Sequence, residues 1–357
     1  MPSPFNKLKM EISGGSHEKC LSLSLEGLPQ GITVDKDALR KFLDRRKSGK
    51  YAFSTPRREE DEVIFTEGLT DGVITGKIKA EIPNNNTRPS DYGYSATPRP
   101  SHADYVAVKK YGAAPSGGGA FSGRMTAALC IAGGIAKQLL ASHGIKVLAY
   151  ISEIAGIGCS TYDNGVPEPS VIESCHDYAY PVTDASKINS VDEQLRSIAS
   201  EGDSAGGIIE CIAYNLPVGL GGPMTEGLEG RLSLSLFAIP AVKSVESGLG
   251  RKIASLRGSD ANDPFAYENG KVVTLTNNSG GINGGISNGM PLTVRVSFRP
   301  TPSISKEQRT VNLEKGENDL IKVRGRHDVA FLPRAVAAVE SAVSLVILDC
   351  MIENNLI

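Results

Sequence analysis

The sequence has no excess of charge of one sign. Its 38 lysines and arginines are balanced by 40 aspartates and glutamates, which gives a formal net charge of −2. Proteins that bind nucleic acid or a membrane surface usually carry a clear basic excess. We therefore expect neither a nucleic acid nor a membrane as a partner of this chain.

Export and membrane signals are also missing. The N-terminus has no apolar signal-peptide core, and the most apolar late segment, Ala335–Leu348, is shorter than the roughly 20 residues that a membrane-spanning helix needs. Both features predict a cytoplasmic protein. The six cysteines form no CxxC pair and mostly lie in apolar runs, which predicts reduced core thiols and no metal site.

Two common nucleotide motifs are absent. Neither GxxxxGK[ST] nor a strand–GxGxxG–helix pattern occurs, which argues against a P-loop site and a Rossmann dinucleotide site. No proline-rich or serine-rich linker divides the chain. With 357 residues, of which 40% are hydrophobic, the chain can bury a large core, and we expect a single domain over residues 1–357.

Periodic apolar residues predict a mixture of strands and helices. Alternating or continuous apolar runs predict strands, at least some of them antiparallel, at Cys20–Leu25, Gly72–Ile82, Lys146–Ile154 and Leu292–Phe298. Helical periodicity and end signals predict helices at Asp35–Arg46, Met125–Ser142, Val191–Ser200, Thr225–Phe237 and Pro333 to about Glu353.

Two segments of the chain share a pattern. A Gly-x-Ser start is followed by a strand and then by Leu-Pro-x-Gly, and the serine stands 13 residues before the proline in both Gly14–Gly31 and Gly202–Gly219. A predicted helix follows each segment. The pattern predicts an internal duplication with pseudo-twofold symmetry and halves of roughly 1–200 and 201–357. The alternative is a chance similarity in a chain with 39 glycines.

A glycine triplet, Gly117–Gly119, precedes the helix expected at Met125–Ser142, and Ser122 is a good N-cap. Bare backbone N–H groups at a helix N-terminus would form an anion cradle, and the nearby Arg99 and Arg124 favour an anionic ligand. The alternative is that the glycines only allow a tight turn.

The five histidines differ in their surroundings. His143 ends a helix, where it complements the helix dipole, and His176 has no evident partner and is expected on the surface. His17, His102 and His327 each lie in a loop rich in glycine, serine, arginine or aspartate. Imidazole titrates near neutral pH, so these loops suggest acid–base chemistry, although a single loop histidine is more often structural.

Arginines are concentrated in loops rather than spaced along helix faces. Guanidinium groups bind carboxylates and phosphates in a bidentate way, so the array suits a small polyanion; solvated surface arginines are the alternative. The residues are Arg45, Arg46, Arg57, Arg58, Arg88, Arg124, Arg299 and Arg326. Thr301 and Ser303 add hydroxyl groups beside Arg299.

Taken together, these segments resemble the chorismate synthase family nearly from end to end. The blocks that carry the resemblance are GGSHEKC, LDRRKSG, RREEDEV, NTRPSDYGY, RPSHADY, KYG with GGG, GDSAGG, LPVGLGGP, IPAVKSVE, NNSGGINGGISNG, RPTPSI and GRHD with PRAV.

The resemblance implies an α+β fold, a βαβ sandwich with helices packed between two antiparallel sheets. It implies a cytoplasmic homotetramer that converts 5-enolpyruvylshikimate 3-phosphate to chorismate and phosphate in the shikimate pathway, towards aromatic amino acids. The reaction needs reduced FMN without net redox change, and NADPH enters only as a possible reductant.

Site residues follow from the resemblance by position. The family's catalytic groups match His17, His102 and Asp328, and its substrate-binding groups match Ser16, Arg46 and Arg124. Its cofactor-binding positions match Ser122, Ala241, Gly284, Arg299, Thr301, Ser303 and Arg326.

Departures from the family pattern leave a second possibility. Ala52, Ala120 and Phe121 stand where the family usually has arginine, arginine and serine, which bears on flavin affinity. A paralogue that binds FMN or a phosphorylated metabolite without catalysing elimination is the alternative. We favour the enzyme, because a binding protein would not need both imidazoles and the carboxylate.

Overall fold

Two antiparallel sheets form the frame of the fold in the computed structural model, which describes residues 3–55, 59–85, 94–160, 162, 165–323, 325 and 327–357. The first sheet has the order β1 (Lys9–Gly14), β2 (Cys20–Glu26), β4 (Val73–Pro83), β3 (Ile64–Thr70). The second has the order β6 (Ile157–Gly158), β5 (Lys146–Ile154), β7 (Gly207–Tyr214), β13 (Leu292–Phe298), β8 (Val242–Ser247).

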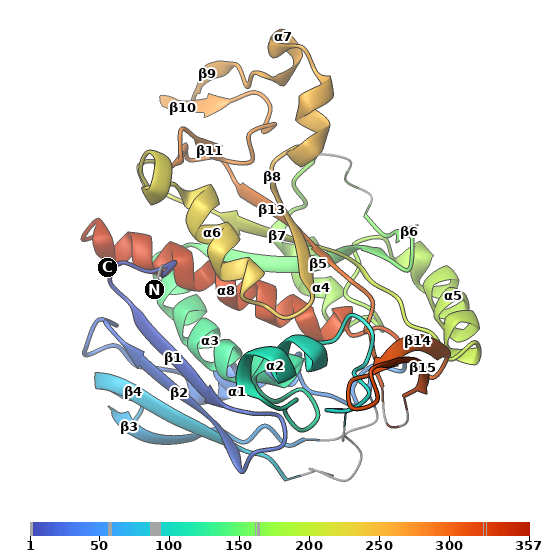
Figure 1. Ribbon diagram of the computed structural model, residues 1–357. Helices are drawn as coiled ribbons and strands as arrows, with labels where there is room; N and C mark the ends of the chain where they lie inside the picture. Colours follow the sequence, from blue (N-terminus) through green and yellow to red (C-terminus); the bar gives the residue numbers. More distant parts are fainter. Residues whose placement is uncertain are drawn as a thin grey trace.

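Helices fill the space between the sheets (Figure 1). The helix α3 (Thr126–Ser142) contacts the first sheet, and α8 (Leu332–Glu353) contacts the second and packs along α3. Gly133 permits this close approach, because a Cβ there would lie 2.1 Å from the Cβ of Ser341. The expected α+β fold with antiparallel sheets is thus confirmed.

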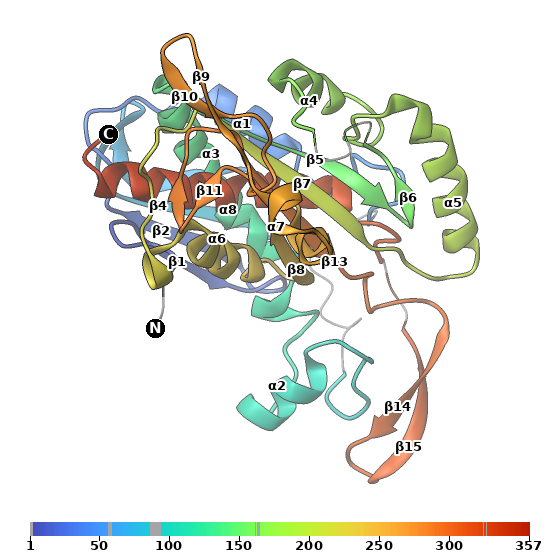
Figure 2. The same ribbon diagram turned by 90° about the horizontal axis from the view of Figure 1, so that it is seen from above.

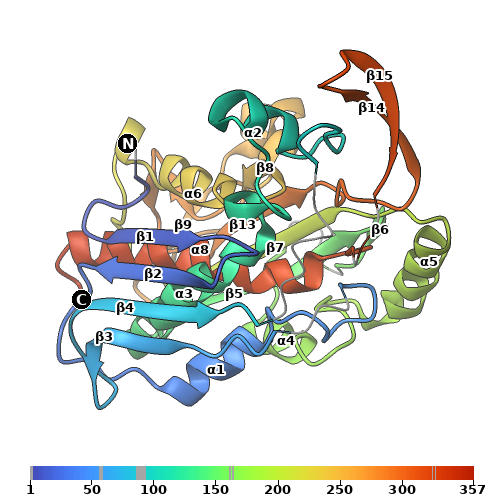
Figure 3. The same cartoon turned by 60° about the horizontal axis from the view of Figure 1, so that its bottom comes forward.

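The flanking helices and smaller elements complete the chain. The helix α1 (Lys36–Asp44) packs on α3, and α6 (Leu228–Phe237) packs on α8. The remaining elements are α2 (Asp104–Tyr111), α4 (Pro169–Cys175), α5 (Ile188–Ser200), α7 (Gly258–Ala261), β9 (Phe265–Glu268), β10 (Lys271–Thr274), β11 (Ile282–Asn283), β12 (Ile286–Ser287), β14 (Glu307–Asn312) and β15 (Glu317–Lys322). Figures 2 and 3 show α2 and the β14–β15 hairpin projecting from the body on the same side.

Local sequence explains the elements that the periodicity predicted. Alternation in β2 points Leu21, Leu23 and Leu25 into the core, where each is at most 2% exposed. Asp35 caps α1 by accepting hydrogen bonds from two backbone N–H groups of the first turn. The strands β5 and β13 have the predicted bounds, and the predicted helices occur with ends shifted by a few residues.

The two sheets have equivalent connections. When the two-residue edge strand β6 is left out, the strands of each sheet, numbered along the chain, follow the order 1-2-4-3, with a helix after the second strand (α1, α6) and a long helix after the fourth (α3, α8). The matching Leu-Pro pairs directly follow β2 and β7. However, β5 precedes residue 200 and pairs with β7 in the second sheet, so the sheets do not coincide with halves of 1–200 and 201–357.

Burial distinguishes core helices from membrane spans here. Among the described residues, the segments Gly123–Ser142 and Leu332–Glu353 are long and apolar enough to cross a membrane, but 61% and 94% of their apolar windows are buried in the protein. The last helix is therefore longer than Ala335–Leu348 suggested, and its packing rather than its length marks it as a core helix. Five of the six cysteines are buried and all are free thiols, as expected.

A buried ion cluster holds α8 against its neighbours. Glu340, with no exposed side-chain surface, accepts hydrogen bonds from Arg45 and Lys137 and from the backbone N–H of Ala149. The expectation that His176 lies on the surface is wrong, because its Nε2 lies 2.8 Å from the carbonyl oxygen of Ala149 and 3.0 Å from Arg45. Burial would raise the pKa of Glu340, but the neighbouring cations outweigh it and hold that pKa well below its usual value.

Loss of the Glu340 charge should destabilise the fold. We expect Glu340→Gln to lower the free energy of unfolding by about 3–5 kcal/mol, because Arg45 and Lys137 would remain buried without a counter-charge. Urea denaturation measures the difference. Glu67→Gln is the matched control, since Glu67 is 56% exposed and pairs with Lys79 on the surface, where we expect a change within about 0.5 kcal/mol. Equal effects of the two substitutions would contradict the structural role of Glu340.

Candidate active site

A single cavity of about 290 Å³ brings together most of the predicted site residues. It lies where the β1–β2 turn, the loop before α2, the start of α3, the loop after β13 and the start of α8 meet. The predicted residues that line it are Ser16, His17, Arg46, His102, Ser122, Arg124, Ala241, Arg299, Thr301, Ser303 and Asp328.

Gly284 does not belong to this group. It lies in the turn between β11 and β12, outside the cavity lining, and its φ of +61° suits a tight turn. The resemblance alone suggested Gly284, and no packing in this chain places it at the cavity. Arg57, Arg58, Arg88 and Arg326 lie outside the described residues.

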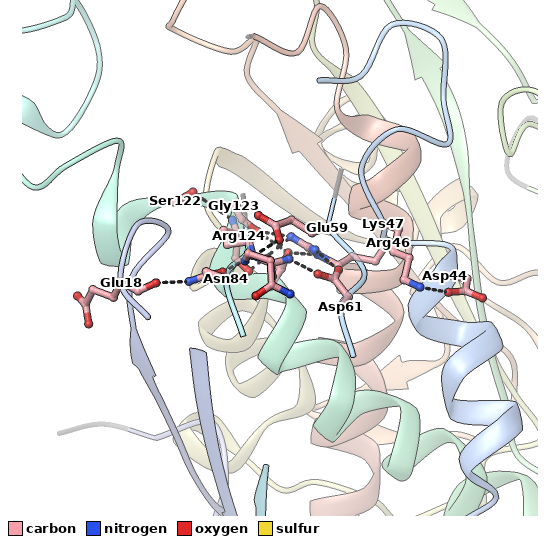
Figure 4. A network of polar contacts seen from close by, with 12 residues as sticks. Glu18, Asp44, Arg46, Lys47, Glu59, Asp61, Asn84, Ser122, Gly123 and Arg124 are labelled. Atoms are coloured by element: carbon pink, nitrogen blue, oxygen red, sulfur yellow. Dashed lines mark hydrogen bonds and ion pairs between the residues drawn. The ribbon is translucent and has the colours of Figure 1, made fainter. Parts of the chain in front are cut away.

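Arg46 and Arg124 share the buried carboxylate of Asp61 (Figure 4). Arg46 donates to Asp61 at 2.7 Å, and Arg124 donates to its other oxygen and, through Nε, to Asn84 at 3.0 Å. Burial would raise the pKa of Asp61, but the two guanidinium groups hold it below its usual value. The Nη2 of Arg124 is buried without a hydrogen-bond partner among the described residues, so we treat it as a donor available to an anionic ligand.

His102 lies at the end of a second buried carboxylate network. Its Nδ1 is 2.7 Å from Oδ1 of Asp104, which has no exposed surface and receives two further hydrogen bonds from the Arg99 side chain. Arg99 also donates to Ser303 Oγ at 3.3 Å, which joins this loop to the loop after β13. The imidazole is therefore fixed at one edge of the cavity.

His17 reaches the cavity from the β1–β2 turn and packs against the glycine triplet. Its Nδ1 lies 2.9 Å from Ser16 Oγ. A Cβ at Gly117, where φ is +70°, would come within 2.1 Å of the imidazole Cε1. The N–H groups of Gly118 and Gly119 donate to the carbonyl oxygen of Ser116. The triplet is thus a tight turn that makes room for His17, and the expected cradle of bare N–H groups is not formed by Gly118 and Gly119.

Asp328 pairs with an arginine that the sequence analysis did not single out. Its Oδ1 accepts from the backbone N–H of Thr55 and from Arg334, each at 2.8 Å. Arg334 belongs to the first turn of α8 and lines the cavity, where its Nε is buried and has no hydrogen-bond partner in the part of the chain that the structure describes. Burial lowers the pKa of Arg334, and the charge of Asp328 opposes this effect. The PRAV block contained Arg334, but its pairing with Asp328 depends on where α8 begins.

The residues expected to contact the flavin lie along another wall. The backbone N–H of Arg299 donates to the carbonyl oxygen of Ala241 at 3.1 Å, and its side chain donates to the carbonyl oxygen of Ser101 at 2.5 Å. Ser122 caps the short 3-10 turn Gly123–Met125 by accepting from Arg124 N–H, whereas the helix α3 itself follows Met125 and has no side-chain cap, so the prediction that Ser122 is the N-cap of this helix is wrong by one turn. Phe121, one of the departures, lines the cavity with 43% of its surface exposed and packs near Tyr111.

The packing of the His17 imidazole against Gly117 can be tested by a substitution that displaces the imidazole. We expect Gly117→Ala to lower turnover by roughly 100-fold or more, because the new Cβ would force the imidazole away from its position. Gly112→Ala is the matched control. Gly112 has a similar φ of +87° but no atom within 4 Å of a Cβ, so its substitution adds backbone strain without moving the site. Steady-state kinetics on both folded variants measures the effect, and similar turnover in the two would contradict this position of His17.

The cavity thus combines buried guanidinium donors with three imidazoles, those of His17, His102 and His327, and with the carboxylates of Glu59 and Asp328. Such a set binds a small polyanion and moves protons, which is typical of an enzyme with an α+β scaffold.

Comparison with known proteins identifies the family. The sequence profile described as chorismate synthase matches residues 8–352. A chorismate synthase of Thermococcus kodakarensis is 44% identical over 352 residues, covering 98% of this chain and 97% of that protein. One of Dehalococcoides mccartyi is 42% identical over 348 residues, covering 96% and 94%. A solved structure described as a crystal structure of chorismate synthase has a TM-score of 0.79 at 25% identity and covers 98% of this chain and 93% of that one.

The chain therefore belongs to the chorismate synthase family. Its function is that of the family, a lyase that breaks a carbon–oxygen bond in the shikimate pathway. These relatives give no support to the alternative of a non-catalytic binding paralogue.

Proposed function

We propose that this cavity eliminates phosphate from 5-enolpyruvylshikimate 3-phosphate to give chorismate. The observation that carries the proposal is the buried, unpartnered Nη2 of Arg124 in a cavity that also contains His17 and His102. A substrate with a phosphate and two carboxylates supplies the anionic oxygens that such a donor needs. Ser16 and Arg46 lie in the same wall and complete the proposed substrate site.

The described residues fit a phosphorylated cofactor such as reduced FMN. Arg299 has no described carboxylate partner and lies near the hydroxyl groups of Thr301 and Ser303. We propose that these residues, with Ser122, Ala241 and Arg326, hold the flavin, with NADPH only as a possible reductant. When bound, reduced FMN supplies electron density to the substrate and recovers it, so the reaction has no net redox change.

The side chains of the protein carry out the proton transfers of the reaction. A trans-1,4-elimination removes the C6 hydrogen and expels phosphate, so it needs both a proton donor and a proton acceptor. We propose that His17 and His102 hold protons at the leaving phosphate and at the cofactor, and that Asp328 is the final acceptor of the proton that leaves carbon, without contacting C6 directly. The Oδ2 of Asp328 has no hydrogen bond to a described residue, whereas its Oδ1 is occupied by Thr55 and Arg334.

The oligomeric state, the cellular location and the internal duplication that the sequence suggested are also proposals. We propose a single-domain cytoplasmic homotetramer that binds neither nucleic acid nor membrane. We also propose that the chain contains an internal pseudo-twofold duplication, supported by the equal strand order of the two sheets. The units would then meet between α3 and β5, near residue 145, because β5 belongs to the second sheet.

An anaerobic assay tests the proposed reaction. Purified protein, dithionite-reduced FMN and 5-enolpyruvylshikimate 3-phosphate should yield chorismate and phosphate in equal amounts. The same mixture with oxidised FMN should yield neither. Binding of both ligands without any product would contradict the proposed reaction.

A further inference from the structure

One oxygen of Asp104 lies between two nitrogens. Oδ1 is 2.7 Å from His102 Nδ1 and 2.8 Å from Arg99 Nη2, and these two nitrogens are 3.1 Å apart. The three atoms form a closed triangle. A guanidinium nitrogen only donates, and Arg99 Nη2 has two N–H groups. One donates to the carbonyl oxygen of Gly117, so the other points either at the carboxylate or at the imidazole.

The other oxygen of Asp104 is also occupied by donors. Oδ2 accepts from Arg99 Nε at 2.7 Å and from the Arg99 backbone N–H at 3.0 Å. Burial alone would raise the pKa of Asp104, but the hydrogen bonds and charges of Arg99 and His102 outweigh it, so this carboxyl is ionised at neutral pH. An ionised carboxylate accepts hydrogen bonds only.

These contacts determine which imidazole nitrogen carries the proton. An unprotonated Nδ1 would direct its lone pair at a buried carboxylate oxygen 2.7 Å away, and the two atoms would repel each other. A protonated Nδ1 instead donates to Oδ1, which then accepts from His102 and Arg99 together. The short contact between the imidazole and the guanidinium follows from their shared acceptor.

We propose that Asp104 is a positioning residue that holds His102 with its proton on Nδ1. Nε2 is then the atom that gives or takes a proton in the cavity, and no described residue forms a hydrogen bond with it. Arg99 reinforces the arrangement because it also donates to the carbonyl oxygen of Gly117, the glycine packed on His17. This inference rests on the proposed function only for the part that His102 plays in turnover.

A purely structural role is the competing explanation. Asp104 is the first residue of α2, and its link to Arg99 could serve only to attach the loop to that helix. The two explanations differ in what an isosteric amide should do. All four groups around the carboxylate are donors, two at each oxygen, so the NH2 of an asparagine must face two of them. Of the four, only His102 can become an acceptor, by moving its proton to Nε2.

The test is Asp104→Asn in the full-length chain. Spectra of protein labelled with ¹⁵N-histidine, recorded at a pH where the imidazoles are neutral, report the tautomer, and the His102 signal is the one lost in His102→Gln. We expect an Nδ1–H tautomer in the parent and Nε2–H in Asp104→Asn. The wrong tautomer should lower kcat by roughly 10²–10⁴-fold, with a much smaller change in KM for the enolpyruvyl substrate.

Asp349→Asn is the matched control for the loss of a buried carboxylate. Asp349 is fully buried and pairs with Arg231, and it accepts three backbone N–H groups near the N-terminus. Its substitution should lower stability while leaving the His102 tautomer and the kcat of the folded protein unchanged. Asp104→Glu retains the charge, so it should keep Nδ1–H and more turnover than Asp104→Asn. If Asp104→Asn does not fold, the tautomer of His102 in the parent decides, since Nε2–H there overturns the inference.

Three results would overturn the inference. They are an Nε2–H tautomer of His102 in the parent, an unchanged tautomer in Asp104→Asn, and a changed tautomer with parental kcat. The proposed function fails separately, through a parent that forms no chorismate, and the spectra would still decide how Asp104 positions His102.

Discussion

Alanine at His17 or at His102 is expected to lower the rate of chorismate formation by roughly 10²–10⁴-fold, the usual effect of removing a positioned acid or base. Both imidazoles line the cavity, and each is held through Nδ1, by Ser16 and by Asp104 respectively. Both residues lie outside regular elements, between β1 and β2 and before α2, so their removal should spare the core. Anaerobic single-turnover kinetics at saturating reduced FMN measures the chemical step.

His143→Ala is the matched control for these two variants. His143 follows α3 and its Nδ1 lies 3.0 Å from the carbonyl oxygen of Leu139, away from the cavity lining. Its loss should leave the rate within about twofold of the parent, since a surface substitution changes little. A rate near the parental one in His17→Ala or His102→Ala would exclude that histidine from the proton-transfer steps.

Much of the scaffold could be predicted from the sequence because its elements have clear local signals. The alternation in β2 and β13 follows from one face of each sheet packing on the central helices. The helix α8 has nearly the bounds that the sequence predicted, but its sequence could not distinguish a core helix from a membrane span, because it is apolar on almost all sides and carries no clear apolar stripe. The pairing of β5 with β7 could not be predicted, because the segment that includes β6, α4 and α5 separates these two strands in the sequence.

The sequence predicted many of the residues that line the site, but it did not predict which carboxylate each arginine and histidine contacts. Histidines and arginines in glycine-rich loops gave His17, His102 and Arg124, all of which line the cavity. Their carboxylate partners Asp61 and Asp104 are buried, and only the folded chain shows that these acids are opposite the arginines. Four of the five arginines in the described lining are paired in this way, and Arg299 is the exception.

His176 is a second case in which the partners of a side chain could not be predicted from the local sequence. Its neighbours in sequence offered no partner, but the α4 helix brings it to Arg45, Glu340 and the backbone of β5. Burial, together with the charge of Arg45, lowers the pKa of His176, so it is neutral in this cluster at neutral pH. The prediction that His176 lies on the surface was based on the polarity of its sequence neighbours. It was wrong because four segments that are distant in the sequence pack together around this side chain.

Asp328→Asn should separate proton transfer from binding. The asparagine Oδ1 can still accept from Thr55 and Arg334, so the loop before α8 should keep its position. The amide that replaces Oδ2 cannot take a proton. We therefore expect reduced FMN and substrate to bind with affinities within about threefold of the parent, while the single-turnover rate falls by roughly 10²–10⁴-fold.

The ion pair with Arg334 makes a second variant informative. Arg334→Gln removes the charge that holds the Asp328 carboxylate but leaves its oxygens able to take a proton. We expect weaker binding as its main effect, because Arg334 also has a buried, unpartnered Nε in the cavity lining. Asp192→Asn, which breaks an Asp–Arg pair on α5, controls for the loss of such a pair elsewhere.

Single-turnover kinetics at saturating flavin distinguishes the two roles of Asp328. If Asp328→Asn forms chorismate at the parental rate once saturated, the carboxylate is not the proton acceptor. Its function is then to orient Arg334, and Asp328→Asn and Arg334→Gln should share the same binding defect. If the rate falls while binding is retained, the free oxygen of Asp328 is the acceptor, and Arg334 holds the opposite oxygen in place so that this one faces the substrate.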